Sequence, residues 1–255
     1  MDLPVNHFKR AIRAGRQQIG LWNSLPSSFV VEALAVTGYD WILIDTEHAP
    51  TEVAEVLPSL QALSSYNVTA AVRPAANDAV LIKRYLDLGV QTLLIPYVQN
   101  ALEAEAAVKA MRYAPRGMRG VAGLTRASRF GKVDNYATRA EDELCLLVQV
   151  ETGDGLAEIE AIAKVDGVDG IFIGPSDLAA SLGHPGDPEH PDVVAAIEDG
   201  ISRIIKTGKP AGILTLNPVF AKRCIELGTS FTAVGVDLAL MNQAAETLAR
   251  EFGKG

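Results

Sequence analysis

Eight short apolar runs, separated by longer amphipathic segments, dominate this 255-residue sequence. Most of the segments between the runs have apolar residues at helical spacing and end near a glycine that can cap a helix. Continuous apolar strands are typical of parallel sheets, and eight strand–helix units favour closure into a barrel. We therefore expect an α/β fold, a (β/α)8 TIM barrel, with strands at residues 19–22, 41–45, 69–74, 92–98, 144–151, 170–174, 211–216 and 231–236.

The chain length agrees with this expectation, because such a barrel typically takes about 250 residues. We interpret residues 1–255 as one barrel domain. The alternative is an open, doubly wound sheet, which usually carries a glycine-rich phosphate turn after an early strand. The chain contains neither GxGxxG nor GxxxxGK, which favours the barrel. The connection over residues 99–143 is unusually long, and loops of this length are usually functional or disordered.

The composition excludes several classes of protein. A net charge of −8, from 31 acidic and 23 basic side chains, argues against nucleic acid or an anionic membrane as partner. The first 20 residues lack the apolar segment of a signal peptide, and no run of about 18 apolar residues follows, so we expect a cytoplasmic protein without a membrane span. Cys145 and Cys224 lack CxxC spacing, which indicates neither a disulfide framework nor a thiolate zinc site. We interpret His184 and His190, in the proline-rich "GHPGDPEHPD", as residues of an exposed loop rather than a ligand pair.

Polar side chains cluster where several predicted strands end. In TIM barrels the carboxyl ends of the strands form one rim, and catalytic residues lie there. Alternation along a strand also points residues two apart to the same side. The polar residues that should meet at this rim are, in chain order, Asp45, Glu47, His48, Arg73, Gln149, Glu151 and Asp177.

Each of these residues also has a purely structural interpretation. Asp177 could cap the helix predicted after it, and His48 could be an ordinary loop histidine. Arg73 could be no more than an ion-pair partner for Asp45. Glu151 is harder to explain in this way, because it continues a run that should be buried. Taken together, the structural explanations require several coincidences on one rim, which favours a functional set.

The residue types in this set indicate a particular chemistry. Glu151 and Asp177 offer hard carboxylate oxygens, which suit Mg²⁺, Mn²⁺ or a similar divalent ion rather than structural zinc. Such an ion can polarise a carbonyl group, and Arg73 could share the negative charge that develops. His48 could move a proton. Together these groups could form an enolate. The lysines do not lie at the carboxyl ends of the predicted strands, which argues against a Schiff base.

The same blocks of residues resemble a known family. From about residue 7 to residue 252 the chain is similar to the HpcH/HpaI aldolase family, in particular its 4-hydroxy-2-oxoheptanedioate and 2-keto-3-deoxy sugar acid aldolases. The blocks that carry the resemblance are "IGLW", "WILIDTEHAP", "VRP", "TLLIPYVQNA", "RYAPRGMRGV", "RASRF", "LVQVET", "VDGIFIGPSDLAASLG", "HP" and "AVGVD".

The resemblance implies a fold, an assembly and an activity. The fold would be a TIM barrel of the phosphoenolpyruvate/pyruvate type whose last helix packs on a neighbouring subunit, in a hexamer built as a trimer of dimers. The activity would be that of a class II aldolase, which depends on Mg²⁺, Mn²⁺ or Co²⁺ and uses neither a Schiff base nor an organic cofactor. It would cleave 4-hydroxy-2-oxo acids, through a metal-bound enolate, into pyruvate or hydroxypyruvate and an aldehyde such as succinic semialdehyde.

The resemblance also implies roles for single residues. Glu151 and Asp177 match the metal ligands, and Gln149 matches a glutamine that contacts substrate. His48 matches the base, which works with Asp45, and Arg73 matches the arginine that stabilises the enolate. Asp87 matches an acid that raises the basicity of the histidine. The backbone amides around Ser176 and Asp177 match the site that binds the substrate carboxylate.

Some positions depart from the family pattern. Thr46 stands where glycine is common, Ser176 where alanine is common, and Asn23 and Pro26 where relatives are more apolar. None of these changes removes a catalytic group, but they leave the aldehyde and the pathway open. Two alternatives also stay open: a lyase of the citrate or malyl-CoA type acting on CoA thioesters, and a non-catalytic sensor of oxo acids.

Overall fold

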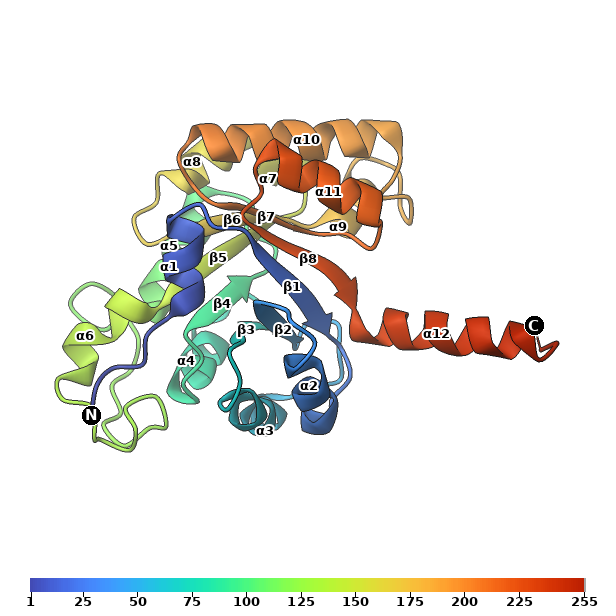
Figure 1. Cartoon of the computed structure of the whole chain (residues 1–255). Coiled ribbons are helices and arrows are strands. Elements are labelled where there is room, and N and C mark those ends of the chain that lie inside the picture. The colour runs from blue at the N-terminus through green and yellow to red at the C-terminus, as the bar shows by residue number, and fades with distance from the viewer. Residues whose placement is uncertain (255) are drawn as a thin grey trace.

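The computed structural model describes residues 1–254, in which eight parallel strands close into a barrel in chain order (Figure 1). The predicted barrel is confirmed, and each predicted run contains a strand. Two strands end two or more residues earlier than predicted, because the chain turns away from the sheet after Ile95 and Leu214. The strands are β1 (Gln18–Asn23), β2 (Trp41–Asp45), β3 (Thr69–Arg73), β4 (Thr92–Ile95), β5 (Cys145–Val150), β6 (Gly170–Ile173), β7 (Ala211–Leu214) and β8 (Phe231–Val236).

Helices cover the outside of the barrel and pack on the outward side chains of the strands. Residues such as Val72 and Ile171 on the strands share one apolar cluster with Ile82 and Ile201 on the helices. None of the helices in the described part of the chain is both long enough and apolar enough to cross a bilayer. The helices between the strands are α2 (Ser28–Ala35), α3 (Val53–Leu63), α4 (Ala79–Asp87), α5 (Ala101–Met111), α6 (Tyr136–Glu143), α7 (Gly153–Ala157), α8 (Ile159–Ala163), α9 (Pro175–Ser181), α10 (Pro191–Lys206) and α11 (Pro218–Leu227).

The barrel interior is filled with large apolar side chains. As strand alternation predicts, Cys145 and Leu147 point inward, where they join Trp41, Phe172 and Phe231. Gly20 and Gly212 make this packing possible, since a Cβ atom at either position would overlap the ring of Trp41 or Phe231. Helix α1 (His7–Arg13), which precedes the first strand, adds Phe8 and Ile12 to the same cluster.

The long connection between β4 and β5 is more structured than the sequence indicates. It contains α6 as well as α5, and irregular backbone joins the two helices. Arg119 holds this irregular part in place: its fully buried guanidinium binds the Asp87 carboxylate at 2.7 Å and lies 4.5 Å from the ring centre of Tyr113. The helical pattern of α6 is only eight residues long and strongly polar, which explains why periodicity did not reveal it.

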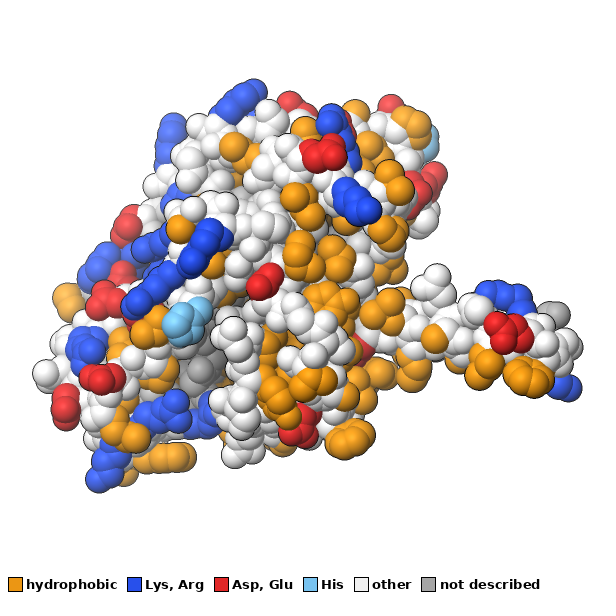
Figure 2. All heavy atoms as spheres, viewed as in Figure 1, with side chains coloured by type: hydrophobic (Ala, Val, Ile, Leu, Met, Phe, Trp, Pro, Cys, Tyr) orange, Lys and Arg blue, Asp and Glu red, His pale blue; other side chains and the backbone are white. Residues whose placement is uncertain are grey.

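The last helix, α12 (Asp237–Glu251), projects away from the barrel (Figure 1). Only its start is anchored: the buried Asp237 carboxylate accepts hydrogen bonds from the Asn23 amide at 2.6 Å and from the Ser24 backbone at 2.9 Å. Along the rest of the segment, Leu240, Met241, Leu248 and Phe252 are 45% to 77% exposed. Figure 2 shows apolar side chains along the projecting helix and further apolar surface on the adjacent barrel.

Candidate active site

The carboxyl ends of β2, β3 and β5 place four polar side chains in the barrel mouth. Asp45 ends β2 and Arg73 ends β3, while Gln149 lies near the end of β5 and Glu151 directly follows it. All four residues are buried, with 2% to 7% of their surface exposed. Buried charges are costly unless they are paired, so their partners indicate what this site is built to do.

Arg73 is clamped between two acids of the β2 end. Its Nε and Nη2 atoms donate to the two oxygens of Asp45 at 2.9 and 2.6 Å. Its Nη1 atom lies 2.9 Å from Glu47 Oε2, and its guanidinium carbon lies 5.1 Å from the ring centre of Trp22. The expected ion pair between Arg73 and Asp45 is therefore present. The guanidinium also lies in the mouth, next to the other acids.

The two acids of this clamp differ in pKa. Burial raises the pKa of Asp45, but the hydrogen bonds and charge of Arg73, with smaller contributions from the Glu47 amide and Trp22, outweigh it and hold the pKa below its usual value. Burial raises the pKa of Glu47, and the negative charges of Asp45 and Asp177 add to this effect against the opposing charge of Arg73. The Asp45 carboxylate is thus held in its ionised form by Arg73. The ionised form of Glu47 is disfavoured, and a further positive charge beside it would stabilise that form.

Glu151 is held in one orientation by two donors. The backbone amide of Tyr97 donates to Oε1 at 2.8 Å, and the side-chain amide of Gln149 donates to Oε2 at 2.5 Å. Tyr97 has a φ of 54°, a left-handed conformation that is uncommon for a non-glycine residue. Gly174 provides space on the other side, because a Cβ atom there would lie 2.6 Å from Glu151 Oε2. The carboxylate is thus fixed by the loop after β4 and by the end of β5, and Gly174 after β6 leaves room for it.

The arrangement of acids around Glu151 fits a divalent cation. Burial raises the pKa of Glu151 to about 7, against the lowering effect of its two hydrogen bonds, and the charges of Asp177 and Glu47 raise it further. Within residues 1–254, the buried Gln149 Oε1 atom accepts no hydrogen bond, and the buried Glu47 Oε2 atom has only the ion pair with Arg73. Three neighbouring carboxylates and two buried acceptor oxygens form the kind of oxygen-rich environment that Mg²⁺ or Mn²⁺ occupies in proteins.

The raised pKa of Glu151 predicts how pH affects the metal-free chain. The folded state binds this proton more tightly than the unfolded state, so the contribution of Glu151 to stability is fully present below pH 4.5 and is lost as pH rises through about 7. A shift of this size corresponds to a loss of about 3 kcal/mol at most. Denaturant unfolding of chelator-treated protein at pH 5 and pH 8 measures the loss. We expect Glu151→Gln to abolish most of it, and an unchanged loss in that variant would contradict the assignment.

His48, Ser176 and Asp177 lie at the outer edge of the mouth. The His48 side chain is 65% exposed, and its Nε2 atom lies 3.8 Å from Glu47 Oε2. Ser176 and Asp177 are exposed in the first turn of α9. The interpretation of Asp177 as a helix cap is wrong, because Gly174 is the N-cap residue and no side chain caps the helix.

Asp87 is the one predicted site residue that does not join this group within a single chain. It ends α4, and the residues that follow it line a cavity at the amino ends of the strands. His48 follows the carboxyl end of β2, so the two residues lie at opposite ends of the barrel. Asp87 instead pairs with Arg119. A role for Asp87 beside His48 therefore requires a second copy of the chain, and the role stays a prediction.

Some residues of the site had no assigned role in the sequence. Glu47 belongs to the conspicuous "DTEH" segment, but only the structure shows that it contacts Arg73 and lies beside His48. Trp22 donates its indole N–H to Asp45 at 3.3 Å. Tyr97 contributes a backbone amide and Gly174 contributes only the absence of a side chain. Neither role can be predicted from the type of side chain in the sequence. A signal for Glu47 existed, because it points to the same side of the strand end as Asp45.

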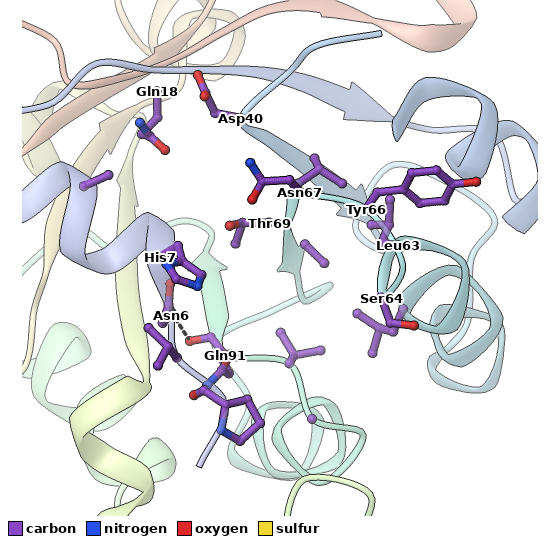
Figure 3. A pocket seen from close by; sticks show the side chains of 18 of the residues that line it. Asn6, His7, Gln18, Asp40, Leu63, Ser64, Tyr66, Asn67, Thr69 and Gln91 are labelled. Carbon is purple, nitrogen blue, oxygen red and sulfur yellow. Dashed lines mark hydrogen bonds between the residues drawn. The ribbon is translucent and has the colours of Figure 1, made fainter. Parts of the chain in front are cut away.

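A cavity of about 580 Å³ lies at the opposite end of the barrel (Figure 3). It is lined by residues at the amino ends of β1 to β4, among them Gln18, Asp40, Thr69 and Gln91. The lining contains none of the residues predicted at the rim. We therefore place the candidate active site at the carboxyl end, where the acids and Arg73 meet.

Comparisons with known proteins identify the family of this chain. Residues 18–244 match the model of the HpcH/HpaI aldolase/citrate lyase family. The chain is 64% identical to a pyruvate aldolase of Rhizobium etli over 99% of both chains. It is 54% identical to a 4-hydroxy-2-oxo-heptane-1,7-dioate aldolase of Klebsiella pneumoniae, over 97% of this chain and 94% of that one. A crystal structure of a family protein from Burkholderia cenocepacia superposes with a TM-score of 0.94 at 37% identity and covers 98% of this chain and 100% of that one. The chain belongs to the HpcH/HpaI aldolase/citrate lyase family and is a carbon–carbon lyase.

Proposed function

We propose that this chain is a class II aldolase that reversibly cleaves 4-hydroxy-2-oxo acids into pyruvate or hydroxypyruvate and an aldehyde such as succinic semialdehyde. The observation that carries the proposal is the convergence of Glu151, Asp177 and Glu47 beside the buried guanidinium of Arg73. This combination suits a substrate that gains negative charge on an oxygen during the reaction. The names of the relatives support the same class of substrate.

We assign the metal site to Glu151 and Asp177. When bound, Mg²⁺, Mn²⁺ or Co²⁺ would polarise the 2-oxo group of the substrate as a Lewis acid. Gln149 holds Glu151 through one amide hydrogen and keeps a free carbonyl oxygen in the mouth. We propose that Gln149, Ser176 and Asp177 contact the oxo-acid end of the substrate.

We assign the proton transfers in both halves of the reaction to His48. In cleavage it would take the proton from the 4-hydroxyl group, so that the aldehyde carbonyl forms as the C3–C4 bond breaks. The electron pair of that bond moves onto the 2-oxo oxygen and leaves an enolate, whose charge Arg73 stabilises. Return of a proton to C3 gives pyruvate. Asp45 serves this step indirectly, because it fixes the orientation of Arg73 through two hydrogen bonds.

We further propose that the chain works as a homo-oligomer, with α12 packed on a neighbouring copy. The exposed apolar side chains of α12 support this, since a projecting helix that exposes several large apolar residues is typical of an interface. A neighbouring copy would also bring its Asp87 within reach of His48. The resemblance implies a hexamer, and sedimentation of the full chain tests it, with a monomer as the contradicting result.

The proposed activity can be tested by pyruvate release from metal-stripped protein. Lactate dehydrogenase reports pyruvate while Mg²⁺, Mn²⁺ or Co²⁺ is added back singly and the chain length of the 4-hydroxy-2-oxo acid is varied. We expect release only after an ion is restored. Acetyl-CoA release from citryl-CoA or malyl-CoA, without pyruvate release from the oxo acids, would favour the thioester-lyase alternative. Binding of oxo acids without any turnover would favour the sensor.

A further inference from the structure

Three side chains with metal-binding atoms meet in the connection between α9 and α10, away from the barrel mouth. His184 Nε2 and His190 Nδ1 lie 3.6 and 3.7 Å from Asp192 Oδ2. One donor atom from each residue lies within 4.8 Å of the other two. The two imidazole rings are stacked, with centres 3.5 Å apart. From the sequence, these histidines are expected to be residues of an exposed loop rather than a ligand pair. They do lie in that loop, each partly exposed, and the structure adds that their rings meet there.

The backbone holds these residues in place. His184 N donates to Ala179 O at 2.8 Å, and Asp187 N donates to His184 O at 3.0 Å. The side chain of Glu189 accepts a hydrogen bond from Asn217 at 3.0 Å, which ties the loop to the start of α11. Prolines at positions 185, 188 and 191 restrict the backbone further. A rigid loop of this kind loses little conformational entropy when a ligand binds.

The donor atoms are close to the spacing that a transition metal requires. Bond lengths of about 2.0–2.2 Å in a tetrahedral zinc site put neighbouring ligand atoms roughly 3.3–3.5 Å apart. The two distances to Asp192 exceed this only slightly. His190 Nδ1 accepts a hydrogen bond from Asp192 N at 3.2 Å and so caps α10, and a metal bound at this atom would replace that hydrogen bond.

The stacked rings must open for both to bind one ion, since a metal lies near the plane of each imidazole. They are inclined by only 14° in the structure. Opening requires rotation about χ2, which is a broad torsion in histidine. Both side chains have room to rotate, with 27% and 32% of their surface exposed.

We propose that His184, His190 and Asp192 form a second metal site, which takes Zn²⁺, Ni²⁺ or Co²⁺ rather than Mg²⁺. Two imidazoles and one carboxylate suit borderline-soft ions, whereas Mg²⁺ prefers oxygen ligands and keeps its water. The mouth, with its carboxylates and the Gln149 oxygen, has the opposite preference. Both sites draw on the connection from β6 to α10, because α9 carries Asp177 in its first turn and leads directly into the histidine loop.

Zinc titration of full-length protein in which the mouth is disabled tests this proposal. Glu151→Gln removes a mouth ligand, and competition with a chromophoric chelator then measures the remaining Zn²⁺. We expect one bound Zn²⁺ per chain, retained in excess Mg²⁺. Adding His184→Gln should weaken binding by more than the roughly 10–100-fold that loss of an outer-shell partner costs. Adding His7→Gln, at the other end of the barrel, should change nothing.

Two further measurements keep the result interpretable. Asp192→Asn should also weaken Zn²⁺ binding, and it leaves both rings in place if His184→Gln disturbs the loop. Co²⁺ or Ni²⁺ should broaden the imidazole NMR signals of His184 and His190 before those of His7. Equal Zn²⁺ affinity with and without His184→Gln, or no Zn²⁺ bound in the Glu151→Gln background, would overturn the proposal. His184→Gln alone should leave Mg²⁺-supported pyruvate release unchanged, so this test is independent of the aldolase assignment.

Discussion

Glu151→Gln is expected to lower kcat/KM for pyruvate release by at least about 10³-fold, because Lewis-acid stabilisation by a metal is worth several kcal/mol. The substitution removes the negative charge and one acceptor oxygen. It also turns a donor group toward either the Tyr97 amide or the Gln149 amide, both of which now donate to the carboxylate. Affinity for Mg²⁺ or Mn²⁺ should fall together with activity. Coupled pyruvate assays and calorimetric metal titration measure the two effects.

The matched control for this variant is Glu158→Gln. Glu158 is an exposed glutamate between α7 and α8 that caps neither helix with its side chain. It should keep the activity and metal affinity of the parent chain, which separates the loss at Glu151 from a general loss of acidic charge. Metal affinity in Glu151→Gln equal to that of the parent would place the ion elsewhere and remove Glu151 from the ligand set.

His48→Ala should lower kcat by about 10²–10⁴-fold, the usual contribution of a positioned general acid–base group. Metal affinity should stay close to that of the parent, because His48 is not among the proposed ligands. Stability should change by no more than about 0.5 kcal/mol, since the side chain is 65% exposed. Steady-state kinetics, metal titration and denaturant unfolding of the same preparation measure the three quantities.

Two controls bear on His48. His7→Ala alters an exposed histidine beside the cavity at the opposite end of the barrel and should not affect turnover (Figure 3). Imidazole added to His48→Ala should restore part of the activity if the lost group moved a proton. Turnover equal to that of the parent chain would rule out His48 as the base and would shift attention to Glu47, which lies 3.8 Å away.

The barrel was predictable because two features of this sequence are strong. Runs such as residues 41–45 and 170–174 are continuously apolar, as strands buried on both faces require, and the segments between most runs are amphipathic. Short elements were not predictable. Helices α7 and α8 have five residues each, which is too short for a helical period to repeat. The eight residues of α6 are mostly polar and likewise carry no apolar stripe.

The candidate site was predictable only in part. The rim position of Glu151 and Arg73 follows from where their strands end, because parallel strands present their carboxyl ends on one side. Their partners do not follow, since contacts between strands depend on register and loop conformation. The Tyr97 amide reaches Glu151 through a left-handed residue, and Asp87 is at the far end of the barrel because α4 runs back along the strands.

The central claim is that the mouth of this barrel stabilises the enolate of pyruvate. Exchange of the pyruvate methyl protons with D₂O, followed by proton NMR, reports enolate formation without any aldehyde or coupling enzyme. The account predicts exchange by the Mg²⁺- or Mn²⁺-loaded chain, little exchange after chelation, and loss of exchange in Glu151→Gln. Pyruvate that binds to the loaded chain but keeps its protons would contradict the account.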